Sequence, residues 1–259
     1  PTSTKIQSIY NPDVTYVTTD EPAESVGRIM QKYDLVAIPV VDSIGRLVGR
    51  ITIDDVVDVI REEAEKDYQM MSGISQDVES SDTMWDQTKA RLPWLIIGLL
   101  GGMLAAYMIS FYEADIALFP ATAMFIPVIT AMGGNVGIQS SAIVVKGLAS
   151  NTLTSKNILQ SISKEISCAV INACICSSII FILSLCFNLT SLAMPITVTI
   201  SLFIVIMFAS MFGTAFPLLL NKLKIDPALA TGPFITLTND IIGLNIYLFT
   251  GKAILGWLL

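Results

Sequence analysis

A nearly charge-free run of 168 residues, 92–259, is the feature that most constrains how this chain can fold. It holds 6 basic and 5 acidic side chains, whereas the 91 residues before it hold 9 basic and 17 acidic ones. Uncharged apolar runs of about 18 residues or more are typical of membrane-spanning helices. We therefore expect an acidic, water-exposed N-terminal part followed by a helical membrane part.

Polar interruptions divide this run into five expected spans. They cover residues 92–112, 116–145, two segments of 166–221 on either side of 188–191, and 228–255. The second span is long enough to be tilted, kinked or broken. The predicted fold class is therefore an α-helical membrane protein with five transmembrane helices, preceded by a small α/β module and a connecting helix.

The basic residues of the loops predict the orientation of these spans, because cytoplasmic loops are enriched in Lys and Arg. Only Lys252 falls on the side opposite to the N-terminal part. We therefore expect the N-terminal part in the cytoplasm, and the odd number of spans places the C-terminus outside. The basic residues on the N-terminal side are Lys89, Arg91, Lys146, Lys156, Lys164, Lys222 and Lys224.

The first 91 residues predict an α/β module and a connecting helix. Residues 25–33 have helical periodicity, 36–41 and 47–53 are short strands, and a second helix runs from about residue 54 to about residue 71. We assign the α/β module to 1–60, the acidic connecting helix and linker to 61–91, and the membrane domain to 92–259. Because the chain begins with Pro and no signal-like segment opens it, we expect a part of a longer protein.

Composition argues against several classes of protein. The net charge of −7 argues against a nucleic-acid partner. The chain has no His, which removes the commonest general base, and no GxxxxGK[ST] motif, so neither an enzyme nor a primary pump is expected. The four Cys residues lack the spacing of a zinc site, and core packing is the preferred interpretation.

Asp240 is the sharpest candidate for a functional residue, because it lies in the middle of an expected span. An intramembrane carboxylate faces protein or a water-filled cavity and is a functional candidate by default. Thr236 and Gly232 lie four and eight residues earlier, so we expect them to share its helical face. The alternative is a packing contact between Asp240 and Asn135 or Gln139.

A glycine-rich segment at residues 132–141 is the second candidate. It contains Gly133, Gly134, Asn135 and Gly137, and three glycines within five residues weaken a helix. An interrupted helix at this depth would turn backbone carbonyls toward an aqueous cavity. The alternative is close helix packing through small residues.

The acidic helix expected from about residue 54 to about residue 71 carries the third candidate, an acidic stripe at helical spacing. Like charges at this spacing repel each other, and divalent cations with oxygen ligands relieve the repulsion. One hypothesis is a sensor that converts cation concentration into a conformational bias. The other is a solvated surface face. The stripe consists of Asp55, Asp58, Glu62 and Glu65.

Two parts of the chain resemble known families. Residues 10–60 resemble a CBS domain in Pro39-Val40-Val41-Asp42, Gly45-Arg46-Leu47-Val48-Gly49 and Thr52-Ile53-Asp54-Asp55. The pair Thr52 and Asp55 is similar to the ribose and phosphate position of CBS modules, which implies a site for ATP or another adenine nucleotide. The membrane part resembles the MgtE family of bacterial magnesium channels, in Gly133-Gly134-Asn135-x-Gly137-x-Gln139-Ser140, Asp226-Pro227-Ala228 and Thr238-x-Asp240.

The second resemblance implies a homodimer in the bacterial plasma membrane with a pore on its two-fold axis. It implies that Asp240 of each subunit holds a largely hydrated Mg²⁺, and that the helix after the CBS module plugs the pore when Mg²⁺ is high. The pore residues would be Asp240, Asn135, Gly134, Thr236 and Gly232. The regulatory acids would be Asp55, Asp58, Glu63, Asp67, Asp34, Glu24 and Asp226, with Lys66 at a position where the family can carry an acid.

The main functional hypothesis is a Mg²⁺-selective influx channel gated by cytoplasmic Mg²⁺. A second hypothesis is a secondary transporter of another divalent cation, Co²⁺ or Mn²⁺, including one that exchanges protons through Asp240. A third is a membrane-anchored adenine-nucleotide sensor without transport. Ion flux in liposomes and its dependence on a pH gradient separate the three.

Overall fold

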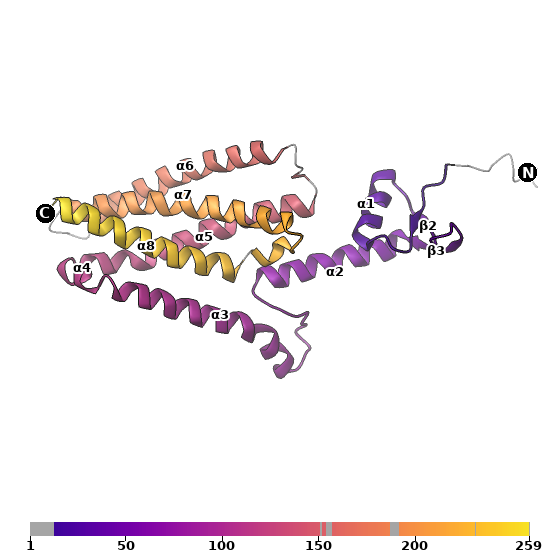
Figure 1. Cartoon of the computed structure of the whole chain (residues 1–259), viewed down its shortest axis with the longest axis horizontal. Coiled ribbons are helices and arrows are strands. Elements are labelled where there is room, and N and C mark those ends of the chain that lie inside the picture. Colours follow the sequence, from indigo (N-terminus) through magenta and orange to yellow (C-terminus); the bar gives the residue numbers. More distant parts are fainter. Residues whose placement is uncertain (1–12, 151, 154–156, 187–191, 231, 259) are drawn as a thin grey trace, which may run out of the picture. The chain divides into compact units, whose positions relative to one another are not determined.

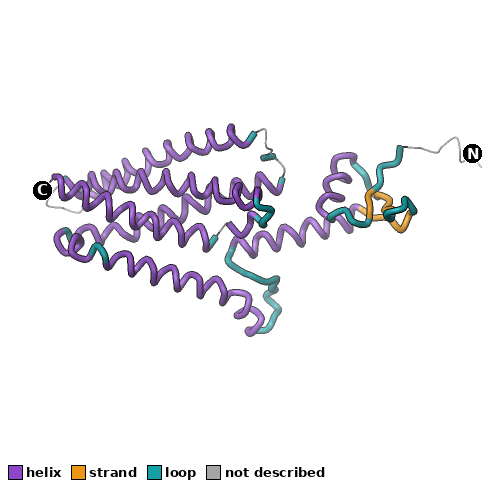
Figure 2. The backbone as a smooth tube through the Cα atoms, viewed as in Figure 1, coloured by secondary structure: helices purple, strands orange, loops and turns teal. Residues whose placement is uncertain are grey.

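The computed structural model describes residues 13–150, 152–153, 157–186, 192–230 and 232–258. Contacts divide the chain into two compact units, Pro1–Asp67 and Tyr68–Leu259. Helices dominate the chain, and the strands described lie in the first unit (Figures 1 and 2).

The first unit is a three-stranded sheet with two helices. Strand β2 lies in the middle of the sheet, parallel to β1 and antiparallel to β3. The expected strands and helices at 25–33, 36–41, 47–53 and 54–71 are found to within two residues. The elements are β1 (Val17–Thr18), α1 (Ala23–Tyr33), β2 (Ala37–Val41), β3 (Leu47–Thr52) and α2 (Ile53–Met71).

The core of this unit is small. It consists of Val17, Val26, Met30, Ile38 and Val56, which come from two strands and two helices. Their apolar faces bury one another, as in any two-layer α/β arrangement.

Helix α2 crosses the boundary that the sequence analysis placed at residue 60. It continues without interruption from Ile53 to Met71, and the two units meet between Asp67 and Tyr68. Most of the acidic helix therefore belongs to the α/β unit, whereas its last turn, residues 68–71, belongs to the second unit.

The second unit is a helical bundle. Its helices are α3 (Met84–Ser110), α4 (Glu113–Leu118), α5 (Ala121–Ala149), α6 (Ile158–Leu185), α7 (Ala193–Lys222), the short 3₁₀ turn η2 (Pro227–Ala230) and α8 (Pro233–Leu258). Within the residues that the structure describes, α3, α5, α6 and α7 are long and apolar enough to cross a membrane. Helix α8 has 26 residues, about 39 Å at 1.5 Å per residue. It carries Asn239, Asp240, Asn245 and Lys252 and is not one of these four.

The second expected span is interrupted in the structure, but not at the glycine-rich segment. The span is broken, because α4 ends at Leu118 and α5 begins at Ala121, with Phe119 and Pro120 between them. The predicted interruption at residues 132–141 is wrong, because α5 is continuous from Ala121 to Ala149. Close packing of the glycines against neighbouring helices explains this segment instead. The expected division at 188–191 lies outside the described residues.

Helices α5, α7 and α8 form the centre of the bundle. All three pack against one another, α6 packs against α7, and α3 packs against α8 (Figure 1). Their shared core includes Phe125, Ile129, Leu202 and Tyr247. The Tyr247 hydroxyl donates to the backbone carbonyl of Thr122 at 2.9 Å, which ties α8 to α5 in the interior.

Candidate cation site

Asp240 faces the glycine-rich segment of α5. Its Oδ1 lies 3.5 Å from the position that a Cβ would take on Gly134, and Cγ2 of Thr236 lies 3.2 Å from the same position. A glycine at this point lets α5 and α8 approach closely at the level of the carboxylate. The structure therefore brings together three of the predicted pore residues, which are Gly134, Thr236 and Asp240.

The Asp240 carboxylate is half-buried, and its side chain makes no hydrogen bond or ion pair within the described part of the chain. Asn135 and Gln139 are exposed on α5. The packing alternative, a hydrogen bond from either side chain to Asp240, is therefore not formed. A carboxylate without a basic neighbour is a suitable partner for the water shell of a cation, since Mg²⁺ keeps several waters and uses one or two carboxylates.

Gly232 does not share the helical face of Asp240, so this expectation is wrong. Helix α8 begins at Pro233, and Gly232 precedes it with a φ of +62°. A Cβ on Gly232 would lie 2.2 Å from the carbonyl oxygen of Met71. Gly232 is therefore a buried joint between the last turn of α2 and the start of α8, and its carbonyl accepts from the Thr236 hydroxyl at 3.1 Å.

Three helices approach closely just beside Asp240. A Cβ on Gly137 of α5 would lie 1.9 Å from Nδ2 of Asn239, and a Cβ on Gly213 of α7 would lie 2.4 Å from the carbonyl oxygen of Gly137. Gly137 is among the residues predicted from the sequence, whereas Asn239 and Gly213 are not. The position of Asn239, directly before Asp240, was the available signal.

Glu165 is a second carboxylate that the sequence analysis missed. Its Oε1 accepts from the Ser140 hydroxyl at 2.6 Å and from the Ser210 hydroxyl at 3.0 Å. The two serines are 3% and 2% exposed, so one carboxylate oxygen joins α5, α6 and α7 in the interior. The expected span begins at residue 166, whereas α6 begins at Ile158 and includes Glu165.

The regulatory acids are spread along the chain rather than clustered. Four of them lie along α2: Asp55, Asp58, Glu63 and Asp67. The described residues contain no group of three or more His, Cys, Asp or Glu that could hold a metal. The remaining three acids have individual positions: Asp34 is the C-cap of α1, Asp226 accepts from the N–H of Ala228 at 2.9 Å, and the side chain of Glu24 lies outside the described part.

Thr52 and Asp55 form a cap at the start of α2. The Thr52 hydroxyl and backbone N–H donate to Oδ2 of Asp55 at 2.6 and 3.1 Å. The carboxylate thus reaches back to the residue that precedes the helix, as in a capping box. The hydroxyl first, and then the N–H, hold the pKa of Asp55 below its ordinary value. The pair therefore has a structural role whether or not a nucleotide binds.

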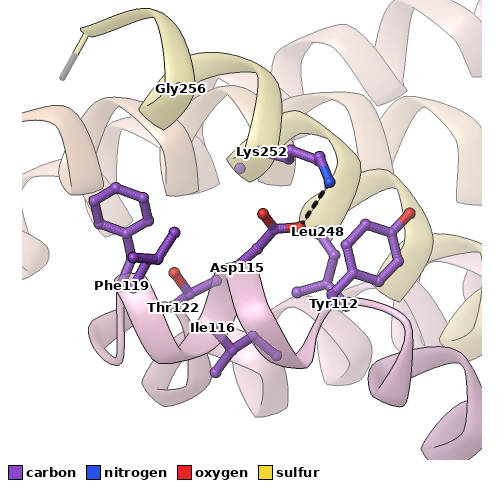
Figure 3. Close-up of a pocket in the computed structure, with 10 residues that line it drawn as sticks. Tyr112, Asp115, Ile116, Phe119, Thr122, Leu248, Lys252 and Gly256 are labelled. Atoms are coloured by element: carbon purple, nitrogen blue, oxygen red, sulfur yellow. Dashed lines mark hydrogen bonds and ion pairs between the residues drawn. The ribbon is translucent and has the colours of Figure 1, made fainter.

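A pocket of about 270 Å³ lies where α4 and the end of α8 meet (Figure 3). Lys252 donates to Asp115 across it at 3.0 Å, between side chains 61% and 30% exposed. The apolar walls include Ile116 and Leu248. Lys252 is 12 residues from Asp240, or about 18 Å along α8, so this ion pair does not neutralise the candidate cation site.

A bundle of apolar helices with a half-buried carboxylate between α5 and α8, preceded by an α/β unit, defines a helical membrane protein with a polar site inside the bundle. Residues 126–250 match the sequence model of the MgtE family, which is described as a divalent cation transporter, and residues 6–62 match that of the CBS domain. Both resemblances seen in the sequence are thereby confirmed.

Similar proteins carry the same family name. The chain is 36% identical to the magnesium transporter MgtE of Bacillus subtilis, over 94% of its own length and 54% of that protein. It is 33% identical to the magnesium transporter MgtE of Thermus thermophilus, over 97% of its own length and 56% of that protein. The chain thus spans about half the length of the curated relatives it matches. These relatives are named as transporters rather than enzymes.

Proposed function

We propose that this chain forms the conducting part of a Mg²⁺-selective channel of the bacterial plasma membrane. Mg²⁺ enters passively, driven by an inside-negative potential that supplies about 2.3 kcal/mol per charge per 100 mV. The observation that carries the proposal is the Asp240 carboxylate, half-buried against Gly134 and Thr236 and without a partner among the described residues. The names of the similar proteins support Mg²⁺ as the ion.

The arrangement in the membrane is part of the proposal. Helix α8 is the fifth span, because it is of spanning length and packs between α5 and α3. The N-terminal unit is cytoplasmic and the C-terminus is outside, as the loop charges favour. Two copies of the chain form a homodimer with both Asp240 residues on the pore. A paired site suits Mg²⁺, which is usually held by one or two carboxylates through its waters.

Gating by cytoplasmic Mg²⁺ is the regulatory half of the proposal. The acids of α2 take up Mg²⁺ when its concentration is high, and their mutual repulsion falls. The last turn of α2 lies against Gly232 at the start of α8, so a shift of this turn reaches the helix that carries Asp240. An adenine nucleotide at Thr52 and Asp55 would act on the same helix.

The test of the pore is Mg²⁺ uptake into liposomes that contain the chain and a Mg²⁺ dye. Asp240→Asn keeps the size of the side chain and removes its charge, and it should lower Mg²⁺ uptake at least tenfold or abolish selectivity over Co²⁺ and Mn²⁺. Asp115→Asn is the matched control, because it also removes a carboxylate but at the far pocket. Equal uptake and selectivity in Asp240→Asn and the unaltered chain would remove Asp240 from the mechanism.

A secondary transporter of Co²⁺ or Mn²⁺ is the second candidate, because a carboxylate without a partner can also carry a proton. A proton-coupled carrier should lose uptake when the pH gradient across the liposome is collapsed. A channel should keep it and follow the membrane potential alone.

A further inference from the structure

Asn239 is a buried amide whose hydrogen-bonding groups are unused. Its side chain is 1% exposed, and neither Oδ1 nor Nδ2 has a hydrogen-bond partner within the described residues. Buried polar groups are nearly always paired, because an unpaired one loses its hydration without compensation. An apolar side chain of the same size would fill this place at a lower free energy. The amide therefore lowers the stability of the bundle in the arrangement described here.

The place of this amide is set by the glycine face of α5. A Cβ on Gly137 would lie 1.9 Å from Nδ2 of Asn239, and a Cβ on Gly133 would lie 3.8 Å from its Cβ. The amide thus lies directly against bare helix backbone. A backbone carbonyl has two lone pairs, and one remains available after the helical hydrogen bond is made. Small movements between α5 and α8 can therefore bring the amide into a hydrogen bond with the α5 backbone.

Asn239 and Asp240 are consecutive residues of one helix, so they move together. Asp240 lies against Gly134, three residues before Gly137 on α5. Any rotation or slide of α8 that pairs the amide with α5 therefore also changes the distance between the Asp240 carboxylate and the α5 face. An ion held through its waters is sensitive to this distance, because the water shell has a fixed size.

We propose that Asn239 is a positioning residue for Asp240, and that its amide makes its hydrogen bond to the glycine backbone of α5 in the ion-conducting arrangement of the two helices. This inference rests on the proposed function. The structure described here is then the arrangement in which that bond is not made. The amide stabilises the conducting arrangement relative to this one, and Asp240 is set at its working distance when the bond forms.

The test compares Asn239→Leu with the unaltered chain in two measurements, Mg²⁺ uptake by liposomes and thermal unfolding in detergent. Leucine has a similar size and needs no partner, so the unfolding temperature should rise or stay unchanged. Uptake should fall at least tenfold, because the conducting arrangement loses its hydrogen bond. We therefore expect uptake to fall while the unfolding temperature rises or stays unchanged. Substitution of a residue with a merely structural role would lower both.

Asn245→Leu is the matched control, because Nδ2 of Asn245 already donates to the Ile241 carbonyl of its own helix at 2.8 Å. Its uptake should stay within about twofold of the unaltered chain. Uptake by Asn239→Leu within twofold of normal would overturn the role of Asn239, and so would parallel losses of uptake and unfolding temperature. If the unaltered chain takes up no Mg²⁺, the proposed function itself fails, which is a separate and recognisable outcome.

Discussion

At the scale of single residues, the pair Thr52 and Asp55 and the single residue Glu165 have roles that differ from those suggested by their sequence context. Thr52 and Asp55 match a nucleotide position of CBS modules, yet in this structure they cap α2. Glu165 lies just before the expected span that begins at residue 166, yet it joins three helices through Ser140 and Ser210. In both cases the contacts come from hydrogen bonds, which residue type and spacing do not specify.

The cap predicts a pH effect that can be measured at one residue. Removing the hydroxyl in Thr52→Val should raise the pKa of Asp55 toward its ordinary value, because the largest hydrogen bond to the charged form is lost. NMR titration of the Asp55 carboxyl in the detergent-solubilised chain measures this pKa. Thr88→Val is the control, since the Thr88 hydroxyl donates only to Met84 of its own helix.

The direction of the stability effect follows from the lowered pKa. In the folded chain the ionised Asp55 contributes stability at pH values above its ordinary pKa, and this contribution is lost as the pH falls through the lowered value. In Thr52→Val, the free energy of unfolding should therefore fall less steeply as the pH is lowered. An unchanged Asp55 pKa in this variant would contradict the role of the cap.

Glu165 gives a second prediction at this scale. Glu165→Leu should lower the free energy of unfolding by about 1–3 kcal/mol, because two buried serine hydroxyls lose the carboxylate and keep only the hydrogen bond between them. Glu165→Gln should lose less, since its amide oxygen can still accept from both. Thermal unfolding in detergent compares the two variants, and equal losses would show that charge rather than hydrogen bonding matters at this position.

At the scale of the elements, sequence predicted most helices and strands but not the details of their packing. The predicted bounds of the helices and strands of the α/β module agree with the structure to within two residues, because turn residues and β-branched runs mark these bounds locally. The glycines of α5 are compatible in sequence with either a weakened helix or close packing, and in the structure they are points of contact with α7 and α8. Which of these a glycine becomes depends on neighbouring helices that local sequence does not reveal.

The glycine contacts predict position-dependent effects of alanine. A Cβ on Gly213 would meet the Gly137 carbonyl, which is backbone and cannot move aside, so Gly213→Ala should destabilise the bundle by about 1–3 kcal/mol. Gly102→Ala is the control on α3, where nothing lies within 4 Å of the new methyl group, and it should be neutral or slightly stabilising. Thermal unfolding in detergent distinguishes the two, and similar unfolding temperatures would contradict the close approach of α5 and α7.

The joint at Gly232 gives a prediction about coupling between elements. Gly232→Ala strains a left-handed residue and drives a methyl group into the Met71 carbonyl, so it should separate the last turn of α2 from α8. If this turn transmits the gating signal, Mg²⁺ uptake should respond less to Mg²⁺ on the side of the N-terminal unit. Gly256→Ala, near the end of α8 with open space around it, is the control.

At the scale of the whole molecule, the acidic excess ends at residue 91, whereas the two units divide earlier, between Asp67 and Tyr68. Sequence predicts the change of charge density, because this density reports on contact with water or lipid. It could not predict where α2 passes from one unit to the other, because a continuous helix gives no local sign of the boundary.

The gating hypothesis makes a prediction at this scale. Neutralising two stripe residues in Asp55→Asn with Asp58→Asn should leave uptake high at Mg²⁺ concentrations that close the unaltered chain. Asp42→Asn, in the turn before β3, removes an acid away from α2 and should close normally. Normal closure in the double variant would reduce the stripe to a solvated face, whereas loss of closure in both variants would indicate a general effect of charge.

The contact of α5 with α7 and α8 also bears on how the molecule is made. A chain emerges from the ribosome with its N-terminus first, so α5 enters the bilayer before α7 and α8 exist. Until they arrive, Gly133, Gly134 and Gly137 lack the helices that pack against them, and Asp240 has not yet been synthesised. Helix α8 is therefore the last of these helices to be made, and a chain that stalls before α8 lacks the candidate cation site.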